Sequence, residues 1–261
     1  MRLSLIIPTL NEKEGIGYTL QAIKEAREKE VSELFPGVDL EWEILVIDGG
    51  STDGTQEIAT EHGAKVVVEK RRGYGRAYKT GFDLATGDFI ATMDGDGTYP
   101  ANELPWMLKR LLHTGLDFIS GDRLSLMEKK AMTREHRIGN WALNSAIRVL
   151  FHEVLKGVPE RVLVDSQSGM WVFKRSLLPA LRLNEDGMPF SEELKLEVIL
   201  HGFKFEEMPI HYAERWGQPK LSSWKDGIGN LLWLLKKRFH VSQEARASSK
   251  LGVSATAPHS P

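Results

Sequence analysis

The 261-residue sequence contains no cysteine. This absence excludes disulfide bonds, thiolate zinc sites and cysteine nucleophiles together. Long hydrophobic runs are missing as well: nowhere do 18 successive apolar residues occur, so no transmembrane helix is expected. The apolar run that follows Met1 is short and is interrupted by Pro8, so a secretory signal is not expected either.

The chain also lacks an excess of charge of one sign. Its formal net charge is −2, so no global basic field indicates a nucleic-acid partner. A hydrophobic content of 41% and a charged content of 27% are ordinary for a soluble globular protein, and the length suits one large domain or two small ones. The composition fits an intracellular enzyme, although it leaves the compartment open.

Two common phosphate-binding patterns are missing. The chain has no Gly-x-x-x-x-Gly-Lys-Ser/Thr segment, and no Gly-x-Gly-x-x-Gly follows the first predicted strand. The segment Gly73-Tyr74-Gly75 falls on a later turn. A dinucleotide dehydrogenase is therefore not expected.

What the chain does have is an alternation of short apolar strands with helical stretches. We predict strands over residues 3–7, 43–48, 65–69, 88–93, 117–121, 170–173 and 203–212. We predict one helix that begins at about residue 12, a second that includes residue 58, and three more over 103–112, 138–150 and 191–201. In the helix over 138–150 we expect the apolar stripe to face the core: Ile138, Trp141, Ala142, Ile147 and Leu150. This alternation indicates βαβ units, and so a three-layer α/β/α fold with a mostly parallel sheet.

Two carboxylates, Asp94 and Asp96, follow the strand at residues 88–93. The surrounding glycines and Pro100 are also typical of a solvated turn. In open α/β sheets, however, ligands bind beyond the carboxyl ends of strands, and adjacent carboxylates suit Mg²⁺ or Mn²⁺ held partly by substrate phosphates. Spacing alone leaves both interpretations open.

Two further segments have alternative interpretations. The basic, glycine-rich residues 70–81 could bind an anion or form a solvated loop. Residues 228–239 are rich in Trp and Leu and end in three cations, so this helix could lie in a membrane interface or dock on the domain. Beyond residue 241 the composition is that of a disordered tail. We therefore expect a catalytic domain over 1–225, an amphipathic helix over 226–240 and a tail over 241–261.

Three segments, taken together, resemble a known family. They are IIPTLNE at residues 6–12, VIDGGSTDGT at 46–55 and MDGD at 93–96. Their order and spacing are similar to those of the inverting family-2 glycosyltransferases of GT-A fold, over roughly residues 1–225. The segments GYGRAYKTG at 73–81, GDR at 121–123 and AMTR at 131–134 resemble the branch that makes dolichyl- and polyprenyl-phosphate sugars, closest to the archaeal enzymes of N-glycosylation.

The resemblance implies roles for individual residues. Asp94 and Asp96 would bind Mg²⁺ or Mn²⁺ and would form the catalytic set with Arg123. Arg134 and Arg137 would face the acceptor phosphate. The nucleotide sugar would be held by Pro8, Leu10, Glu12, Asp48, Lys79, Gly95, Arg215 and Lys220.

The chain departs from the branch pattern at three places. Thr98 stands where the branch often has Gln, two residues after the second metal aspartate. Gly49 replaces the second residue of the usual Asp-Asp pair, which leaves Asp48 for the base or its ribose. Arg215 and Lys220 are one residue closer together than in the usual closing loop.

The expected reaction is inverting transfer of a hexose from a UDP- or GDP-linked sugar to dolichyl or polyprenyl phosphate. A phosphate acceptor is already ionised and needs placement by arginine, whereas a hydroxyl acceptor would need a base such as Glu192 or Glu193. We expect peripheral contact with the cytoplasmic face of a membrane, partly through Lys129, Lys130, Arg134 and Arg137. The alternatives are a family-2 enzyme with a soluble acceptor and a sugar-nucleotide-binding module without turnover; the sequence indicates no oligomeric state.

Overall fold

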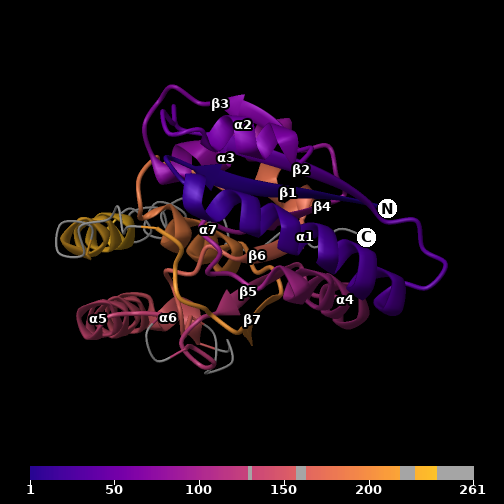
Figure 1. Cartoon of the computed structure of the whole chain (residues 1–261). Helices are drawn as coiled ribbons and strands as arrows, with labels where there is room; N and C mark the ends of the chain where they lie inside the picture. The colour runs from indigo at the N-terminus through magenta and orange to yellow at the C-terminus, as the bar shows by residue number, and fades with distance from the viewer. Residues whose placement is uncertain (129–130, 157–162, 218–226, 240–261) are drawn as a thin grey trace.

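The computed structural model describes residues 1–128, 131–156, 163–217 and 227–239, and the strands within them form one sheet (Figure 1). The order across it is β3-β2-β1-β4-β6-β5-β7. The strands are β1 (Arg2–Thr9), β2 (Glu41–Asp48), β3 (Lys65–Val68), β4 (Phe89–Thr92), β5 (Phe118–Asp122), β6 (Trp171–Lys174) and β7 (Phe205–Pro209). β6 runs antiparallel to both neighbours, and the other pairs are parallel. The predicted mostly parallel sheet is confirmed.

Helices cover both faces of this sheet. They are α1 (Lys13–Leu34), α2 (Thr55–Glu61), α3 (Tyr74–Leu84), α4 (Leu104–Thr114), α5 (Arg134–Leu150), α6 (His152–Leu155) and α7 (Phe190–Leu200), with short 3₁₀ turns η1 (Ala101–Glu103) and η2 (Arg175–Ala180). Residues 227–239 are helical as well. Among the described residues, no helix is both long and apolar enough to cross a bilayer.

The side-chain alternation of the strands creates the three layers. In β1, Leu5 and Ile7 pack on one face together with residues of α1 and α4, whereas Ile6 packs on the other with residues of α3 and α7. The same alternation divides β2, where Val46 joins the first face and Leu45 the second. The predicted α/β/α architecture is thus confirmed.

The sheet order reverses direction beside β1. From β1 the chain adds β2 and β3 on one side, and it then returns to place β4 on the other side. At such a switch point the loops after neighbouring strands part, which opens a crevice beyond their carboxyl ends. Asp48 is the last residue of β2, and the loops after β1 and β4 carry Glu12 and Asp94. The topology therefore gathers these three carboxylates at one edge of the sheet.

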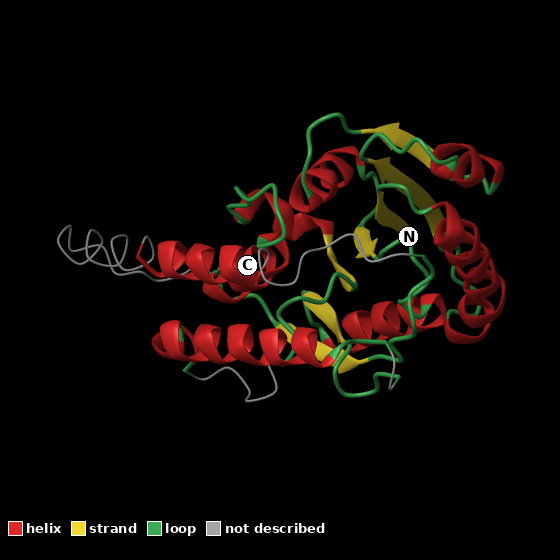
Figure 2. Cartoon of the chain, turned by 60° about the vertical axis from the view of Figure 1, so that its left-hand side comes forward, coloured by secondary structure: helices red, strands yellow, loops and turns green. Residues whose placement is uncertain are grey.

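A third hydrophobic cluster lies outside the sheet. It joins Leu143 and Ile147 of α5 to Trp233 and Leu234 of the helix at residues 227–239, with contributions from α6 and α7. Both views show α5 and the C-terminal helix side by side, extending away from the sheet (Figures 1 and 2). The C-terminal helix is therefore docked on the rest of the protein by one of its faces. The predicted tail at 241–261 lies outside the described residues.

The prediction for the apolar stripe of α5 was wrong at several positions. Ile138 and Trp141 are 66% and 70% exposed, and Ala142 is also exposed, whereas Ile147 is fully buried. The buried face of α5 is instead defined by Leu143, Ile147 and the two asparagines Asn140 and Asn144. Apolar residues occur all around this helix, so their spacing did not determine which face packs. The last strand is also shorter than predicted, at Phe205–Pro209.

Candidate active site

The turn after β4 holds Asp96 in a fixed orientation. Its Oδ1 accepts hydrogen bonds from the backbone N–H of Thr98 at 3.1 Å and from the Thr98 hydroxyl at 2.7 Å. Its Oδ2 lies 3.1 Å from Nη1 of Arg215. Thr98, which stands where the resembling branch often has Gln, thus orients the second carboxylate of the predicted metal pair.

Asp94 is half-buried beside Asp96. Burial and the neighbouring negative charge raise the pKa of Asp94 to about 7, against the opposing effect of Arg123 and Arg215. Two such carboxylates repel each other, and a divalent cation would relieve that repulsion. Among the described residues no cluster of three or more His, Cys, Asp or Glu side chains could hold a metal. Two carboxylates are a donor set that could hold Mg²⁺ or Mn²⁺ together with phosphate oxygens, because Mg²⁺ commonly takes only one or two carboxylates.

Arg215 joins the carboxylate turn to the loop after β1. Its Nη2 donates to Oε1 of Glu12 at 2.6 Å, while Nη1 reaches Asp96. The next residue, Trp216, donates its backbone N–H to the carbonyl of Asp96 at 3.0 Å, and its ring lies against Tyr18 of α1 with centroids 5.6 Å apart. The structure thus brings Glu12, Asp96 and Arg215 into contact, while Lys220 lies outside the described residues. Their contact with a nucleotide sugar stays a prediction.

Asp48 is fully buried at the end of β2 and is engaged within the protein. Its carboxylate accepts hydrogen bonds from the backbone N–H groups of Gly50 and Ser51 and from the side chains of Thr9, Ser51 and Gln56. These contacts fix the loop between β2 and α2 against β1. Pro8 is partly buried on β1, and Leu10 is 48% exposed beside the same loop. Contact of any of them with a base stays a prediction.

The glycine-rich segment packs against the chain itself. A Cβ on Gly73 would lie 2.1 Å from the carbonyl oxygen of Asp186, which explains the glycine there. The backbone N–H groups of Gly75 and Arg76, at the start of α3, donate to the carbonyls of Gly187 and Asp186. These two amides are consequently already bonded within the protein, and anion binding by the rest of residues 70–81 stays a prediction.

Lys79 of α3 contacts the loop that contains Asn184 and Asp186. Its Nζ lies 2.6 Å from Oδ1 of Asp186 and donates to the carbonyl of Asn184. The predicted contact of Lys79 with the nucleotide sugar is untested, and in this structure its ammonium instead holds α3 against the loop that precedes α7.

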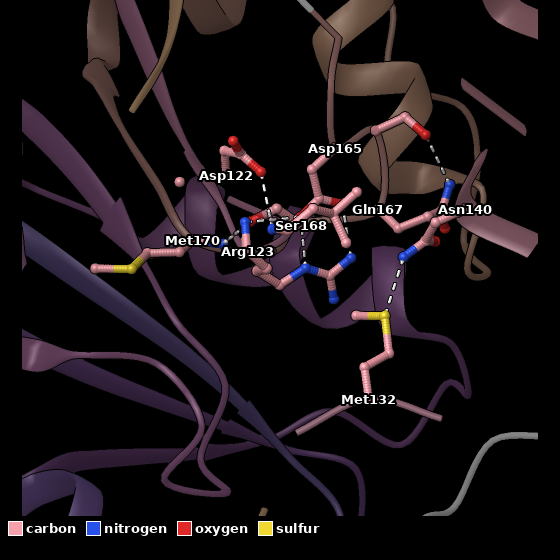
Figure 3. Close-up of polar contacts among 12 residues, drawn as sticks. Asp122, Arg123, Met132, Asn140, Asp165, Gln167, Ser168 and Met170 are labelled. Carbon is pink, nitrogen blue, oxygen red and sulfur yellow. Dashed lines mark hydrogen bonds and ion pairs between the residues drawn. The ribbon is translucent and has the colours of Figure 1, made fainter. Parts of the chain in front are cut away.

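Arg123, immediately after β5, is held by a carboxylate from a distant segment. Its Nε and Nη2 donate to Oδ2 and Oδ1 of Asp165 at 2.7 and 2.8 Å, and its backbone N–H also donates to Oδ2 (Figure 3). The guanidinium carbon lies 5.4 Å from the centroid of the Tyr212 ring. The sequence analysis assigned no role to Asp165, because its pairing with Arg123 spans 42 positions and leaves no local pattern.

The segment that contains Asp165 adjoins the carboxylate pair. Gly169 donates its backbone N–H to the hydroxyl of Tyr99 at 2.8 Å, and its carbonyl accepts from Thr92 at the end of β4. A Cβ on Gly169 would lie 3.5 Å from Oδ1 of Asp94 and 2.3 Å from the hydroxyl of Tyr74. Gly95, also predicted as a site residue, is buried against Thr9 and Ile16. The segment that holds Arg123 therefore adjoins Asp94, and Arg123 is close enough to oppose the rise of the Asp94 pKa.

Four further residues considered from the sequence lie on α5 and α7. Arg134 and Arg137 are exposed on the first turn of α5, and no hydrogen bond or ion pair among the described residues joins them to the aspartates. Glu192 and Glu193 are buried on α7. Glu192 accepts from Nε2 of Gln167, and burial raises the pKa of Glu192 to about 8. Glu193 accepts from the backbone N–H of Glu185.

Comparison with known proteins identifies relatives of this chain. The sequence pattern of the family described as "Glycosyl transferase family 2" matches residues 4–182. The low-salt glycan biosynthesis hexosyltransferase of Haloferax volcanii is 34% identical over 236 residues, which cover 89% of this chain and 53% of the relative. The glycosyltransferase AglJ of the same organism is 33% identical, with 81% of this chain and 63% of the relative covered. The chain thus spans about half to two thirds of the length of these two relatives.

Another relative matches along most of both chains. The dolichyl-phosphate hexose transferase of Haloferax volcanii is 30% identical, with 86% of this chain and 89% of the relative covered.

Solved structures share the fold. Mannosyl-3-phosphoglycerate synthase from Rubrobacter xylanophilus superposes with a TM-score of 0.67 at 18% identity, covering 99% of this chain and 77% of its own. Glucosyl-3-phosphoglycerate synthase from Mycobacterium tuberculosis superposes with a TM-score of 0.67 at 22% identity, covering 90% of this chain and 79% of its own. The expected GT-A fold is confirmed. Since the family pattern extends over residues 4–182, well over half of the chain, this protein belongs to glycosyl transferase family 2.

Proposed function

We propose that this glycosyltransferase transfers a hexose from a UDP- or GDP-linked sugar to dolichyl or polyprenyl phosphate, with inversion at the anomeric carbon. The observation that carries the proposal is the placement of two arginines, Arg123 and Arg215, around the Asp94–Asp96 pair. Phosphate groups are the anions that such a group of cations and paired carboxylates would bind together. The names of two relatives support the acceptor: the dolichyl-phosphate hexose transferase and the dodecaprenyl-phosphate galacturonate synthase of Rhizobium johnstonii.

The carboxylate pair would hold the metal. Mg²⁺ or Mn²⁺ on Asp94 and Asp96 would neutralise charge on the departing diphosphate. Arg123 is already fixed by Asp165 and would present a preorganised positive charge to a phosphate. Arg215, now shared between Glu12 and Asp96, would turn toward the donor phosphates. A structure of the glucosyl-3-phosphoglycerate synthase contains Mn²⁺ together with UDP-glucose, which supports a divalent metal as the partner of the nucleotide sugar.

The two glutamates considered as general bases favour a phosphate acceptor. Glu192 and Glu193 are 0% and 2% exposed, and both carboxylates accept hydrogen bonds from the protein. A base for a sugar hydroxyl must be within reach of that hydroxyl, whereas an ionised phosphate needs no base. The exposed Arg134 and Arg137 would meet the acceptor phosphate as it arrives from the lipid side.

The C-terminal helix supports peripheral membrane contact. Its face opposite Trp233 and Leu234 exposes five apolar side chains at helical spacing: Ile228, Leu231, Leu232, Leu235 and Phe239. A helix with such a face lies in a bilayer interface more readily than in water. We propose attachment to the cytoplasmic face of a membrane through this helix and the exposed arginines of α5. Lys129 and Lys130, predicted to take part, lie outside the described residues.

The function is tested with a panel of radiolabelled UDP- and GDP-sugars, Mn²⁺ and two acceptors. We expect product with a short polyprenyl phosphate and none with 3-phosphoglycerate, and loss of product in the Asp96→Asn variant. Turnover with the soluble acceptor alone would contradict the proposal and favour the alternative family-2 activity. Metal-dependent nucleotide binding without any product would favour the non-catalytic module.

The membrane contact is tested on the exposed face alone, because truncation at residue 226 would also remove the buried Trp233 and Leu234. We expect the triple variant Ile228→Gln, Leu232→Gln, Leu235→Gln to lose cosedimentation with anionic liposomes. The matched control replaces three exposed apolar residues elsewhere: Val38→Gln, Trp106→Gln and Leu112→Gln. Equal binding of both variants would place the anchor elsewhere.

A further inference from the structure

Residues 164–166, which carry the partner of Arg123, belong to no helix or strand, yet their backbone is held on several sides. Three buried side chains from three separate elements make these contacts: Asn144 of α5, Lys195 of α7 and Glu207 of β7. A segment without secondary structure must satisfy its backbone groups by other means. Here it does so through side chains that are rarely buried.

Each side chain binds a different part of the segment. Glu207 Oε2 accepts from the backbone N–H groups of Val164 and Asp165. Lys195 Nζ donates to the carbonyl of Asp165. Asn144 donates to the carbonyl of Val164 and accepts from the N–H of Ser166 at 3.1 Å. The backbone of Asp165 is therefore held at its N–H by an anion and at its carbonyl by a cation.

Burying Lys195 and Glu207 costs desolvation free energy, so this arrangement adds little to the stability of the fold. Lys195 is 0% exposed and lies 3.7 Å from Oε1 of Glu207, which has 2% of its side chain exposed. Burial lowers the pKa of Lys195 and raises the pKa of Glu207 to about 7, which reports the desolvation that both charges experience. Buried ion pairs are weak contributors to stability, because desolvation offsets their attraction. Stability alone thus gives little reason for two charges here.

The position of the Asp165 backbone determines the orientation of the Arg123 guanidinium. Asp165 engages one N–H of Nε and one of Nη2, so both N–H groups of Nη1 and the second N–H of Nη2 are left to meet another anion. A shift of the Asp165 backbone would rotate the whole planar group, since both of its bonds to the carboxylate would move together. The direction of Nη1 therefore depends on what holds Asp165.

We propose that Lys195, Glu207 and Asn144 are positioning residues: they fix the backbone of Asp165 and, through its carboxylate, aim Arg123 at a substrate phosphate. The inference rests on the proposed function in so far as Arg123 contacts a phosphate in the reaction.

The kinetic test is a double-mutant cycle between Lys195→Met and Arg123→Lys. We expect Lys195→Met to lower kcat about tenfold with the donor KM within about twofold, because it disturbs orientation and not ground-state binding. On the Arg123→Lys background the same change is expected to lower kcat by less than about twofold. Lys174→Met, which breaks the Lys174–Asp117 pair at the far end of β6, is the matched control. An equal loss on both backgrounds would overturn the proposal.

A readout that does not need turnover separates this inference from the proposed function. The Nε–H resonance of Arg123, assigned by its loss in Arg123→Lys, is expected to be protected from exchange with water. Protection should fall at least about tenfold in Lys195→Met, and it should persist in Lys174→Met. If Lys195→Met does not fold, Lys195→Met/Glu207→Gln leaves no unpaired buried charge and is measured instead. Unchanged protection would overturn the inference even in an active enzyme, whereas lost protection would support it even if no lipid-phosphate product forms.

Discussion

Nη1 of Arg215 lies 3.1 Å from Oδ2 of Asp96, the carboxylate proposed to bind the metal. The guanidinium and a divalent cation would compete for the same carboxylate. Arg215 also forms an ion pair with Glu12, at 2.6 Å. Arg215 therefore balances the carboxylate pair in this structure, and its release would accompany metal binding.

The first prediction concerns this competition. Arg215→Met is expected to raise the affinity for Mn²⁺ alone several-fold, roughly the effect of removing one ion pair of about 1 kcal/mol, while transfer activity falls. Free Mn²⁺ is measured by electron paramagnetic resonance in the absence of nucleotide. Arg71→Met, which breaks the partly exposed Arg71–Glu69 pair, is the control. An unaltered Mn²⁺ affinity would show that Arg215 and the metal do not compete.

The second prediction concerns Thr98. Thr98→Val keeps the shape and removes the hydroxyl that donates to Asp96 Oδ1. Groups that orient a metal ligand typically affect metal affinity by about 10-fold or more. We expect a loss of about this size in Mn²⁺ affinity in the presence of UDP, measured by calorimetry. Thr60→Val, at an exposed helix position, serves as control, and equal affinities in the two variants would refute the orienting role.

The third prediction concerns the bidentate bond of Arg123. Lysine cannot reproduce the paired Nε and Nη2 contacts with Asp165, so Arg123→Lys is expected to lower kcat by about 10²–10³. Arg110→Lys is the matched control, because Arg110 binds Glu206 in the same bidentate manner on the exposed side of the sheet. It should change kcat less than about twofold. Similar losses in both variants would argue against a role for Arg123 in the reaction.

The fourth prediction compares two helical glycines. A Cβ on Gly15 would lie 2.7 Å from Cα of Asp96, so Gly15→Ala must displace the carboxylate turn. We expect a lower melting temperature and weaker Mn²⁺ binding. Gly139 in α5 has nothing within 4 Å of its added Cβ, and Gly139→Ala should stabilise the protein by about 0.5–1 kcal/mol. Stabilisation by Gly15→Ala would contradict the close approach.

The fifth prediction concerns pH. The pKa of Glu192 is raised to about 8, so between about pH 4.5 and 8 the folded state keeps a proton that the unfolded state releases. Stability from this group is therefore present at low pH and is lost as the pH rises. Glu192→Gln can still accept from Gln167 and never ionises. We expect urea unfolding to give the parent and Glu192→Gln the same free energy of unfolding at pH 4. At pH 9 the variant should be more stable, by on the order of a few kcal/mol.

The control for this comparison is Glu57→Gln, at an exposed position of α2, which is expected to change the free energy of unfolding by less than about 0.5 kcal/mol at either pH. A constant difference between parent and Glu192→Gln across the pH range would contradict the assigned shift.

Much of the fold could be predicted because the signals are local. The alternation in residues such as Leu5, Ile6 and Ile7 specifies a strand covered on both faces, and these residues pack in the two predicted layers. Asp48 ends β2 and Asp94 follows β4 by two residues, and the carboxyl ends of parallel strands meet at one edge of a sheet. The position of these two carboxylates at one edge was therefore predictable from the sequence.

The sequence by itself determined the family, the layered fold and the carboxylate pair, since each depends on residues close together in the chain. Only the tertiary structure decided that Asp165 holds Arg123, that Lys195 and Glu207 hold Asp165, and that Trp141 faces outward. These contacts join residues about 30 to 42 positions apart, or depend on which face of a helix finds a neighbour. The physical reason is that burial and charge pairing are properties of the packed chain, which no local pattern contains.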